Sequence, residues 1–315
     1  MESFWNNLPK PFFVLAPMAD VTDQAFRRVI AKYGKPDVMW TEFVSADGLF
    51  LGGREALMPD LVFTEAEQPI VAQFFTSKPE MMEKAAALAV ELGFDGVDIN
   101  MGCPDRTIEK QGAGAAMIKN PSLAVEIIKA AQQGAGGLPV SVKTRVGYNR
   151  VEIESWLPVL LKTGIAALTV HARTRKEMSL VPARWEHVKE AVALRNELAP
   201  DTFILGNGDA LNLSDARKKV EDSGADGAML GRAIFGNPWL FADKVPSLQE
   251  KLTVMVEHTK LYEELLGGKK SFAVMKKHYR AYVNGFDGAK ELRMELMEAK
   301  DAKDVEQTTK KFLER

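Results

Sequence analysis

The sequence predicts an α/β protein, a TIM (β/α)8 barrel followed by a small all-helical C-terminal bundle. Between Phe12 and Leu230, eight short apolar runs with the pattern of buried strands alternate with helical patterns. Strict alternation indicates parallel strands joined by right-handed crossovers, and eight such units favour a closed barrel over an open sheet. After Pro246 only helical periodicity remains. We therefore expect a barrel domain over residues 1–245 and a helical domain over residues 246–315.

Each predicted strand is a run of apolar residues bounded by Gly, Pro or polar residues. In chain order the runs are 12–17, 38–41, 70–74, 96–100, 140–144, 167–171, 202–207 and 227–230. Runs of this length, rich in Val, Ile and Phe, are typical of strands buried on both faces. Glu42 is expected at the end of the second strand.

The helices between the strands have recognisable ends. Thr22 and Asp23 cap the first helix, which Gly34 and Pro36 end. A Gly-containing helical stretch follows the second strand to about residue 57. Pro158 predicts a break or kink in its helix, because proline lacks the N–H that a helix interior uses. The remaining helices are expected at about 79–92, 121–133, 152–161, 185–198 and 214–223.

Beyond residue 246, apolar residues recur at helical spacing in four segments separated by short breaks. Such breaks between amphipathic helices indicate a small antiparallel bundle. The periodic residues are Leu252, Met255, Thr259, Tyr262 and Leu266, then Phe272, Met275, Tyr279 and Tyr282, then Leu292 and Leu296, and finally Val305, Thr308 and Phe312.

Composition indicates a globular protein with a substantial core. The chain has 315 residues, of which 46% are hydrophobic and 27% charged. A single cysteine excludes an internal disulfide, and the four histidines lack the spacing of a metal site, so we expect no metal. No stretch has the pattern of a signal peptide or a membrane span. We therefore expect a cytoplasmic monomer without a membrane partner.

The formal net charge of −2 provides no broad basic surface for nucleic acid, so any polyanion site must be local. One basic run stands out in the predicted helical domain. Lys269, Lys270, Lys276, Lys277 and Arg280 occur there without an intervening acidic residue. Two interpretations of this run are open. The residues could contact phosphates, or they could form an ordinary solvent-exposed helix face.

Polar residues collect at the carboxyl ends of the predicted strands, where barrels of this kind build their active sites. Gln73 and His171 also have structural interpretations, as an ordinary polar residue at the barrel mouth and as a histidine bonded to backbone. In strand order the strand-end residues are Pro17-Met18, Glu42, Gln73, Asn100 with Cys103, Lys143 with Arg145, His171 with Arg173, Asn207-Gly208-Asp209 and Gly231-Arg232.

Two of these strand ends point to a bound phosphate. Asn207-Gly208-Asp209 and Gly231-Arg232 follow the seventh and eighth strands, where barrels commonly bind phosphate. Lys143 and Arg145 are two residues apart, so they face the same way, into the mouth. A cation there suits a flavin, whose reduced ring is anionic. Plain loops and a structural ion pair of Lys143 remain alternatives. The residues alone predict a barrel enzyme with a phosphorylated cofactor and do not name it.

The only cysteine, Cys103, lies in the loop Asn100-Met101-Gly102-Cys103-Pro104 after the fourth strand. Gly102 permits unusual backbone conformations and Pro104 favours an extended Cys103, so the thiol lies on a constrained turn. A buried cysteine acting as a small apolar residue is the structural alternative. Gly112 and Gly114 downstream are expected to let this loop move.

Five motifs resemble those of the bacterial tRNA-dihydrouridine synthases. The resemblance covers nearly the whole chain and extends to Lys276-Lys277-His278 and to residues 288–293 in the helical tail. The Cys103 motif is the most specific of the five. The motifs are residues 16–23 (APMADVTD), 100–104 (NMGCP), 170–174 (VHART), 207–209 (NGD) and 231–232 (GR).

The resemblance implies an FMN enzyme that reduces the C5=C6 bond of a uridine in tRNA, with NADPH as the usual reductant and NADH as the alternative. Hydride from the reduced flavin would reach C6, and Cys103 would protonate C5 as general acid. Asn100 and Arg145 would position the base. A thiol suits an acid role because its pKa, about 8.5, keeps it mostly protonated at neutral pH. The residues implied to bind FMN are Pro17, Met18, Ala19, Gln73, Lys143, His171, Asn207, Gly208, Asp209, Gly231 and Arg232.

The tail would bind the second substrate, tRNA. Lys276 and Arg280 lie one helical turn apart on a shared face, and Lys277 is adjacent. A uridine must leave its stack to reach a barrel mouth, so a bundle that grips the backbone has a mechanical purpose. No Gly-x-Gly-x-x-Gly follows a strand, so NADPH would reduce FMN in the same pocket and leave before tRNA enters.

The chain departs from the family pattern in two loops, at residues 105–110 and 178–184, which we expect to face tRNA. Two other functions remain open. An FMN enzyme could act on a free pyrimidine, as dihydroorotate dehydrogenases do, and a tRNA-binding protein could have dispensable catalysis. The basic tail argues against the first, and a Cys103→Ala variant would separate the second from the catalytic hypothesis.

Overall fold

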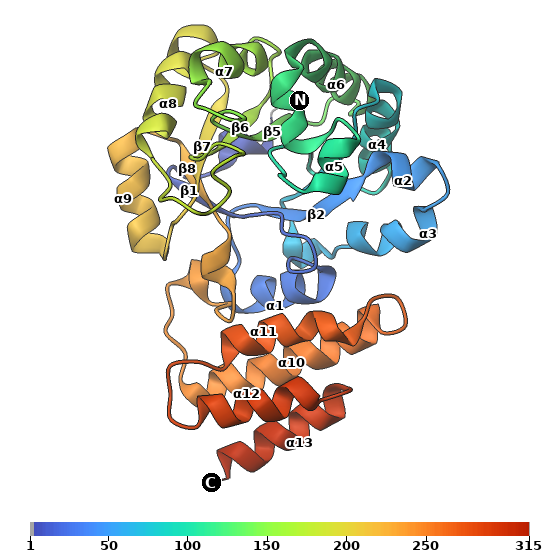
Figure 1. The fold of residues 1–315 in the computed structure, drawn as a ribbon, viewed down its shortest axis with the longest axis vertical. Helices are drawn as coiled ribbons and strands as arrows, with labels where there is room; N and C mark the ends of the chain where they lie inside the picture. The colour runs from blue at the N-terminus through green and yellow to red at the C-terminus, as the bar shows by residue number, and fades with distance from the viewer. Residues whose placement is uncertain (1–2, 315) are drawn as a thin grey trace.

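The computed structural model describes residues 3–314 and shows a ring of eight parallel strands with helices outside it (Figure 1). Neighbouring strands pair in the order β1-β8-β7-β6-β5-β4-β3-β2. This arrangement confirms the predicted TIM barrel. The strands are β1 (Phe12–Leu15), β2 (Met39–Ser45), β3 (Ile70–Phe75), β4 (Gly96–Met101), β5 (Val140–Arg145), β6 (Ala167–His171), β7 (Phe203–Asn207) and β8 (Gly227–Leu230).

The ring closes between β1 and β2 on a short seam. A single parallel bridge joins Val14 to Val38, and the Leu15 N–H donates to the Val38 carbonyl at 3.1 Å. By contrast, β4 and β5 are in register over five residue pairs, from Val97 with Val140 to Met101 with Thr144. The seam between β1 and β2 is therefore the weakest backbone pairing in the ring.

Helices follow the strands as predicted. Asp23 caps α1, and its carboxylate accepts from the Phe26 N–H. Helix α7 continues through Pro158, so the predicted break is absent. Trp156 and Leu160 on its buried face compensate for the missing hydrogen bond. The barrel helices are α1 (Gln24–Gly34), α2 (Ala46–Phe50), α3 (Arg54–Leu57), α4 (Pro79–Glu91), α5 (Arg106–Lys110), α6 (Pro121–Gly134), α7 (Ile153–Leu161), α8 (Glu186–Leu198) and α9 (Leu213–Ser223).

Strand β2 is longer than predicted. It runs to Ser45, so Glu42 lies within the strand and not at its end. The pairing of β2 with β3 shifts register between Trp40 and Phe43, which marks a β-bulge. Bulges re-aim side chains beside functional sites, and this one lies at Glu42.

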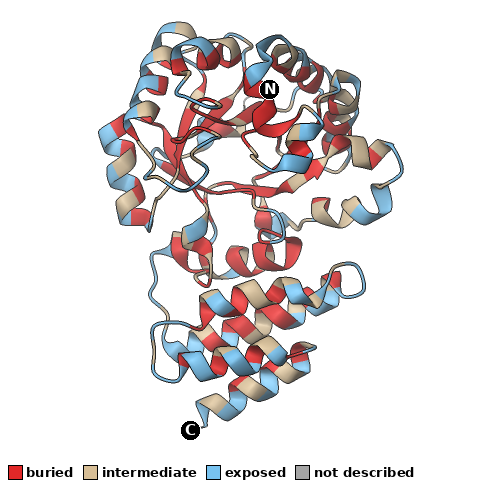
Figure 2. Ribbon diagram, in the orientation of Figure 1, coloured by how far each residue is buried: buried red, intermediate tan, exposed pale blue. Residues whose placement is uncertain are grey.

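The apolar core has two layers in the barrel. Side chains inside the ring, including Trp5, Phe12 and Trp40, form one cluster, and a larger cluster lies between the strands and the surrounding helices. Figure 2 shows the strands as almost continuously buried, whereas most outer helices are buried on one side only. Strands covered on both faces explain the continuous apolar runs in the sequence.

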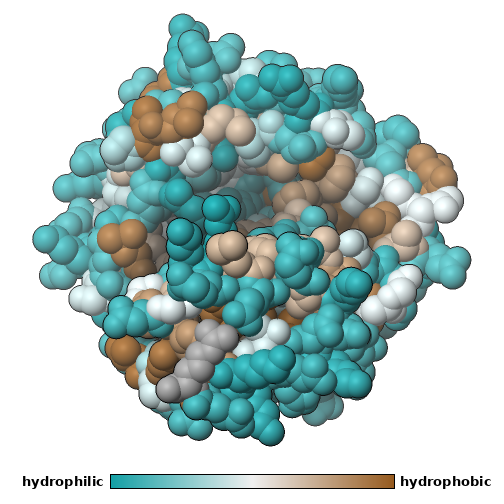
Figure 3. Space-filling view, turned by 60° about the horizontal axis from the view of Figure 1, so that its bottom comes forward, coloured by the Kyte–Doolittle hydropathy of each residue, from teal (hydrophilic) through white to brown (hydrophobic). Residues whose placement is uncertain are grey.

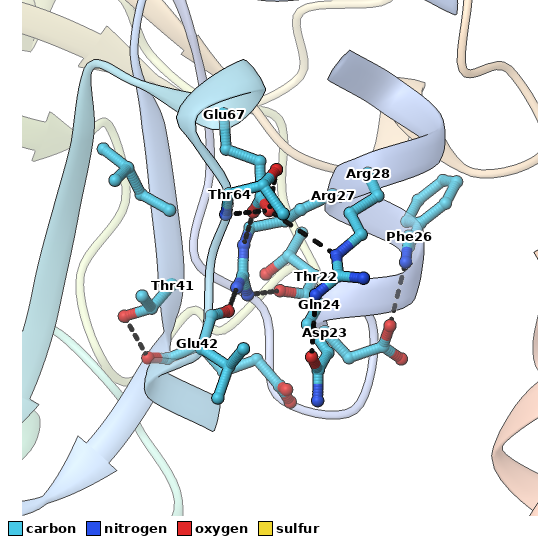
Figure 4. Close-up of polar contacts among 12 residues, drawn as sticks. Thr22, Asp23, Gln24, Phe26, Arg27, Arg28, Thr41, Glu42, Thr64 and Glu67 are labelled. Atoms are coloured by element: carbon cyan, nitrogen blue, oxygen red, sulfur yellow. Dashed lines mark hydrogen bonds and ion pairs between the residues drawn. The ribbon is translucent and has the colours of Figure 1, made fainter. Parts of the chain in front are cut away.

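A buried ion pair ties α1 to the segment before β3 (Figure 4). Arg27 Nε lies 2.7 Å from Glu67 Oε2, and both side chains are fully buried. The Arg27 guanidinium also donates to the carbonyls of Thr22 and Val62. Such a pair is tolerated in the interior because its remaining donors are satisfied.

The C-terminal helices form the predicted bundle beneath α1 (Figure 1). They share an apolar cluster that includes Leu252, Tyr279 and Leu292, and Ala25 of α1 belongs to the same cluster. None of the helices in residues 3–314 has the length and apolar character needed to cross a membrane. The bundle consists of α10 (Leu248–Leu266), α11 (Met275–Tyr282), α12 (Ala289–Glu298) and α13 (Ala302–Leu313).

Candidate active site

A cavity of about 740 Å³ opens at the carboxyl ends of the strands. Most of the sequence-predicted cofactor residues line it, together with one predicted substrate residue, Arg145. The lining residues come from β5, β6, β7 and β8, from the turns after β1, β6, β7 and β8, and from the loop after β4, as expected for a TIM barrel. The predicted residues in the lining are Pro17, Met18, Lys143, Arg145, His171, Asn207, Gly208, Asp209, Gly231 and Arg232.

The lining is strongly cationic. It contains Lys143, Arg145, Arg173 and Arg232 but only one carboxylate, Asp209. Burial and the nearby Arg145 lower the pKa of Lys143 to about 8, and burial with Arg173 lowers the pKa of Arg145 to about 10. These cations repel one another in a site of low dielectric, so an anion bound between them would relieve the repulsion.

His171 is the neutral member of this group. Burial, followed by the charges of Arg145 and Lys143, lowers its pKa well below the usual value. Its Nε2 lies 3.2 Å from the Arg173 guanidinium. Because a guanidinium can only donate, Nε2 of the neutral ring is the acceptor here, which leaves Nδ1–H as the donor to a bound ring or chain.

Asp209 orients two arginines at the β7–β8 side of the cavity. Its carboxylate binds the guanidinium groups of Arg173 and Arg232 and accepts from the Ala183 N–H at 2.8 Å. Although burial raises the pKa of Asp209, the bond from Arg173 holds it below its usual value. The carboxylate therefore stays charged and fixes the arginines. Because Arg173 also donates to the Val181 carbonyl and contacts His171, its remaining N–H groups and those of Arg232 are the donors available to a phosphate.

Gly208 is required by geometry in the turn after β7. Its φ is +123°, and an added Cβ would lie 2.8 Å from the Ala183 Cβ. At Gly231 the nearest atoms to an added Cβ are Ala16 Cβ and Met18 Sδ, both at 3.5 Å. Only the first turn therefore demands glycine, because side chains are disfavoured at positive φ.

The Cys103 loop lies at the edge of the cavity. Pro104 is in the lining, whereas Cys103 is half-buried and packs against an apolar cluster of Phe75, Ile108 and Ala113. Burial raises the pKa of the Cys103 thiol, so it is protonated at neutral pH. The loop is closely packed, since an added Cβ at Gly114 would lie 2.7 Å from the Cys103 carbonyl oxygen.

Four of the residues predicted in the barrel domain, Ala19, Gln73, Asn100 and Cys103, are not in the cavity lining. Gln73 is fully buried, and its amide donates to Asp98 at 2.6 Å and accepts from Asn100 at 3.0 Å. Asn100 Oδ1 accepts from the N–H groups of Gly102 and Cys103 at 3.1 and 2.9 Å. In this structure Asn100 shapes the cysteine loop, and the Gln73 amide, which makes one donated and one accepted bond, keeps a second N–H and a second lone pair.

The loop after β6 contributes lining residues that the sequence did not predict, Met178 and Ser179. Arg145 holds this loop through the carbonyls of Thr174 and Met178, at 3.1 and 3.2 Å, and also donates to the Gly102 carbonyl at 2.8 Å. The available signal for Met178 and Ser179 was that both lie in the segment 178–184, which departs from the family pattern. Arg145 thus links both loops around the mouth.

The loop after β6 contacts α5, which lies in the first atypical segment, residues 105–110. Arg175, in the loop after β6, binds the carboxylate of Glu109 in α5 through two nitrogens, with Nε at 2.9 Å from both oxygens. Arg175 also lies over the ring of Tyr148, 5.4 Å from its centroid. Arg175 precedes the second atypical segment, residues 178–184, and the exposure of both segments to tRNA stays a prediction.

The predicted basic surface on the C-terminal helices is smaller than expected. Lys276, Lys277 and Arg280 lie on α11, with Arg280 exposed and the lysines half-buried. Lys270 is instead held by Glu42 at 3.0 Å and Asp60 at 2.7 Å, so it does not belong to an exposed phosphate surface. Figure 3 shows a largely hydrophilic face, hollowed near its centre, when the bundle end is turned forward.

The residues present fit FMN. Four cations facing one carboxylate suit a phosphate and an anionic reduced ring, and the positive φ of Gly208 allows close approach of backbone. Among residues 3–314 no group of three or more His, Cys, Asp or Glu side chains is placed to hold a metal ion.

Comparison with known proteins identifies the relatives of this chain. A sequence model described as dihydrouridine synthase matches residues 14–315. A protein of Bacillus subtilis (strain 168), named probable tRNA-dihydrouridine synthase 2, is 45% identical over 310 residues, which cover 96% of this chain and 94% of that protein. A probable tRNA-dihydrouridine synthase of Staphylococcus aureus (strain MRSA252) is 41% identical over 302 residues, covering 94% and 91%.

Solved structures with the same fold are more distant. Morphinone reductase in complex with tetrahydroNAD aligns with a TM-score of 0.51 at 16% identity, over 74% of this chain and 86% of that one. A variant of NCR from Zymomonas mobilis gives 0.52 at 16% identity, over 78% and 92%. These likenesses show the barrel fold alone. The family match over nearly the whole chain, with the relatives above 40% identity, confirms the resemblance seen in the motifs: the chain belongs to the dihydrouridine synthase family.

Proposed function

We propose that this protein is an FMN-dependent tRNA-dihydrouridine synthase that reduces the C5=C6 bond of a uridine in tRNA, with NADPH as reductant. The observation that carries the proposal is the cationic cavity at the strand ends with the Cys103 loop at its edge. The names of the relatives from Bacillus and Staphylococcus support the same activity.

FMN would be held by the residues that line the cavity. Arg173 and Arg232, oriented by Asp209, would bind its phosphate, while Lys143 and His171 would contact its ring and chain. The proposed set is completed by Pro17, Met18, Ala19, Gln73, Asn207, Gly208 and Gly231. When bound, FMN supplies the hydride that adds to C6 of the uracil.

Cys103 would supply the proton at C5. Its thiol is protonated because burial raises its pKa, and transfer leaves a thiolate near Arg145 and Lys143, whose charges favour it. Arg145 holds the Gly102 carbonyl in the same loop at 2.8 Å, so it can both orient the loop and stabilise charge there. Asn100 would orient the loop and contact the base.

Lys276, Lys277 and Arg280 on α11 would contact tRNA phosphates. Charge contacts with phosphates supply affinity without sequence information. The uridine would have to leave its stack to enter the cavity, as for other enzymes that modify a base.

The test is nucleoside mass spectrometry of tRNA from a strain that lacks dihydrouridine, incubated with the purified protein, FMN and NADPH. We expect uridine to be converted to dihydrouridine, and an unchanged uridine content would refute the proposal. Parallel reactions with free uracil, dihydroorotate and NADH identify the substrate and the reductant. Turnover of a free pyrimidine without tRNA would favour the small-molecule alternative.

A further inference from the structure

Glu42 lies between two segments that are far apart in the chain. Its Oε1 accepts from the Asp20 N–H at 2.5 Å, and its Oε2 accepts from Lys270 Nζ at 3.0 Å. The side chain is 4% exposed. Figure 4 shows Glu42 beside the turn that carries Thr22 and Asp23. Both oxygens of one buried carboxylate are therefore used to join the barrel mouth to the C-terminal helices.

The first contact holds the turn after β1. Asp20 has a positive φ of 53°, a conformation that needs support in a residue other than glycine. Within the same turn the N–H groups of Val21 and Thr22 donate to the Met18 carbonyl, at 3.1 and 3.0 Å. Met18 lines the cavity. A substitution of Glu42 would therefore alter the position of Met18 in the lining of the proposed cofactor site.

The second contact holds the connection between α10 and α11. The Lys270 N–H donates to the Leu266 carbonyl at 2.9 Å, at the end of α10. The next residue, Ser271, caps the 3-10 turn η7 (Phe272–Val274) that runs into α11, and its carbonyl accepts from the Tyr262 hydroxyl at 3.0 Å. Lys270 is therefore placed to fix where α11 begins.

The charges around Lys270 make this contact specific. One cation serves the carboxylates of Glu42 and Asp60, with the buried Asp23 nearby. Burial and Asp60 raise the pKa of Glu42 to about 7, while Glu42 and Asp60 raise the pKa of Lys270 despite its burial. A buried ion pair contributes little net stability, but removing one partner leaves an uncompensated charge. The cluster of Glu42, Asp60 and Lys270 thus favours one relative position of the turn after β1 and the connection between α10 and α11.

We propose that Glu42, through Lys270, is a positioning residue that couples the cofactor-side turn at residues 16–22 to helix α11 and so sets the distance between bound tRNA and the reaction site. The coupling between the turn and α11 does not depend on the proposed function. Only its consequence for tRNA modification rests on that function. The bulge in β2 explains why Glu42, predicted at a strand end, reaches sideways to both partners.

The experiment compares full-length, FMN-loaded variants Glu42→Gln, Lys270→Met and Lys270→Arg with the wild type. A matched control is the exposed pair Lys260–Glu306, 2.6 Å apart between α10 and α13, tested as Lys260→Met and Glu306→Gln. Steady-state kinetics with tRNA are measured together with hydrogen exchange of residues 16–22. The exchange readout requires no tRNA and no turnover.

We expect Glu42→Gln and Lys270→Met to raise KM for tRNA by roughly three- to thirtyfold, with a smaller change in kcat. Lys270→Met should also speed exchange in residues 16–22, to which Glu42 connects Lys270, while Lys270→Arg largely restores both values. If Lys270→Met has the same KM for tRNA and the same exchange rates in residues 16–22 as the wild type, the inference is overturned. If the wild type does not modify tRNA, the proposed function fails while the exchange comparison still decides the coupling. If Glu42→Gln does not fold, the two Lys270 variants decide it.

Discussion

At the scale of single residues, Cys103 is the group on which the proposed chemistry depends most. The thiol lies on a loop whose two N–H groups, of Gly102 and Cys103, are held by Asn100, and burial against Phe75 and Ile108 keeps it protonated. A proton donor needs both properties, a fixed direction and a pKa above the working pH.

Replacing Cys103 with alanine should lower the rate of dihydrouridine formation by about 10²- to 10⁴-fold, the usual contribution of a general acid. Binding of FMN and tRNA should stay within about twofold, because the side chain is small and lies beside the cavity. Single-turnover reduction of tRNA measures the rate, and reduction of bound FMN by NADPH, followed by absorbance, serves as the internal control. An unchanged single-turnover rate would remove the role given to Cys103.

Gln73 and Asn100 show what the sequence leaves open at this scale. Their places in the third and fourth strands were predictable from the apolar runs, although Gln73 lies within β3 and not at its end. The partner that each amide chooses was not predictable. In the structure they bind each other, and Gln73 also binds Asp98. Lys270 is the same case, because its partner Glu42 precedes it by 228 residues and no local pattern indicates the pairing.

At the scale of elements, the turn between β7 and α9 combines strain with close packing. Gly208→Ala would place a side chain at a φ of +123° and 2.8 Å from Ala183. We expect a loss of about 1–3 kcal/mol in the free energy of unfolding and weaker FMN binding. The control is Gly52→Ala, which has a φ of +111° but no atom within 4 Å of the added Cβ. Denaturant unfolding and FMN titration separate the two effects, and equal FMN affinity in both variants would contradict the prediction.

Helix α11 is the element predicted to bind tRNA. The double variant Lys276→Gln and Lys277→Gln should raise the Kd for tRNA and reduce the slope of log Kd against log salt by roughly one for each phosphate that is no longer neutralised. Lys303→Gln with Lys311→Gln on α13 removes two exposed lysines from another face and should have little effect. Filter binding at several salt concentrations gives both slopes. Equal slopes for the two double variants would count against α11 as the tRNA-binding element.

Most element positions followed from the sequence because each strand is covered on both faces and each helix on one. Those two conditions produce continuous and periodic apolar patterns that can be read without a structure. The exceptions have local causes. Strand β2 extends past Glu42 through a bulge, and α7 absorbs Pro158 because its buried face holds the helix together.

At the scale of the whole molecule, two buried histidines lie where the barrel meets the bundle. The rings of His258 and His278 are 4.7 Å apart, and Phe26 of α1 stacks on His258 and meets His278 edge-on. Within residues 3–314 neither nitrogen of His278 has a hydrogen-bond partner. Burial, with Lys277 nearby, lowers the pKa of His278 to about 3, and burial lowers that of His258 well below its usual value.

This junction should therefore make the protein sensitive to acid. Between about pH 6.5 and pH 3 the unfolded chain binds a proton at His278 that the folded chain does not, so stability falls as pH falls through that window, by up to ~1.4 kcal/mol per pH unit. His278→Phe should flatten the dependence, and His187→Phe on α8 is the control. Because its pKa is raised, Glu42 contributes stability that increases as pH falls, but this contribution is the same in the wild type and in both variants. Denaturant unfolding between pH 4 and pH 7 tests this, and equal slopes in all three proteins would contradict it.

The short seam between β1 and β2 has a consequence for exchanging parts between relatives. The ring closes there on one bridge, α1 connects the two strands, and Ala25 of α1 is part of the apolar cluster of the bundle. The C-terminal helices thus cover the helix that spans the least-paired edge of the barrel. A chimera that takes residues 246–315 from a relative would also need the residues of that relative on the outward face of α1. Otherwise the transplanted bundle would pack poorly against the α1 of the recipient barrel.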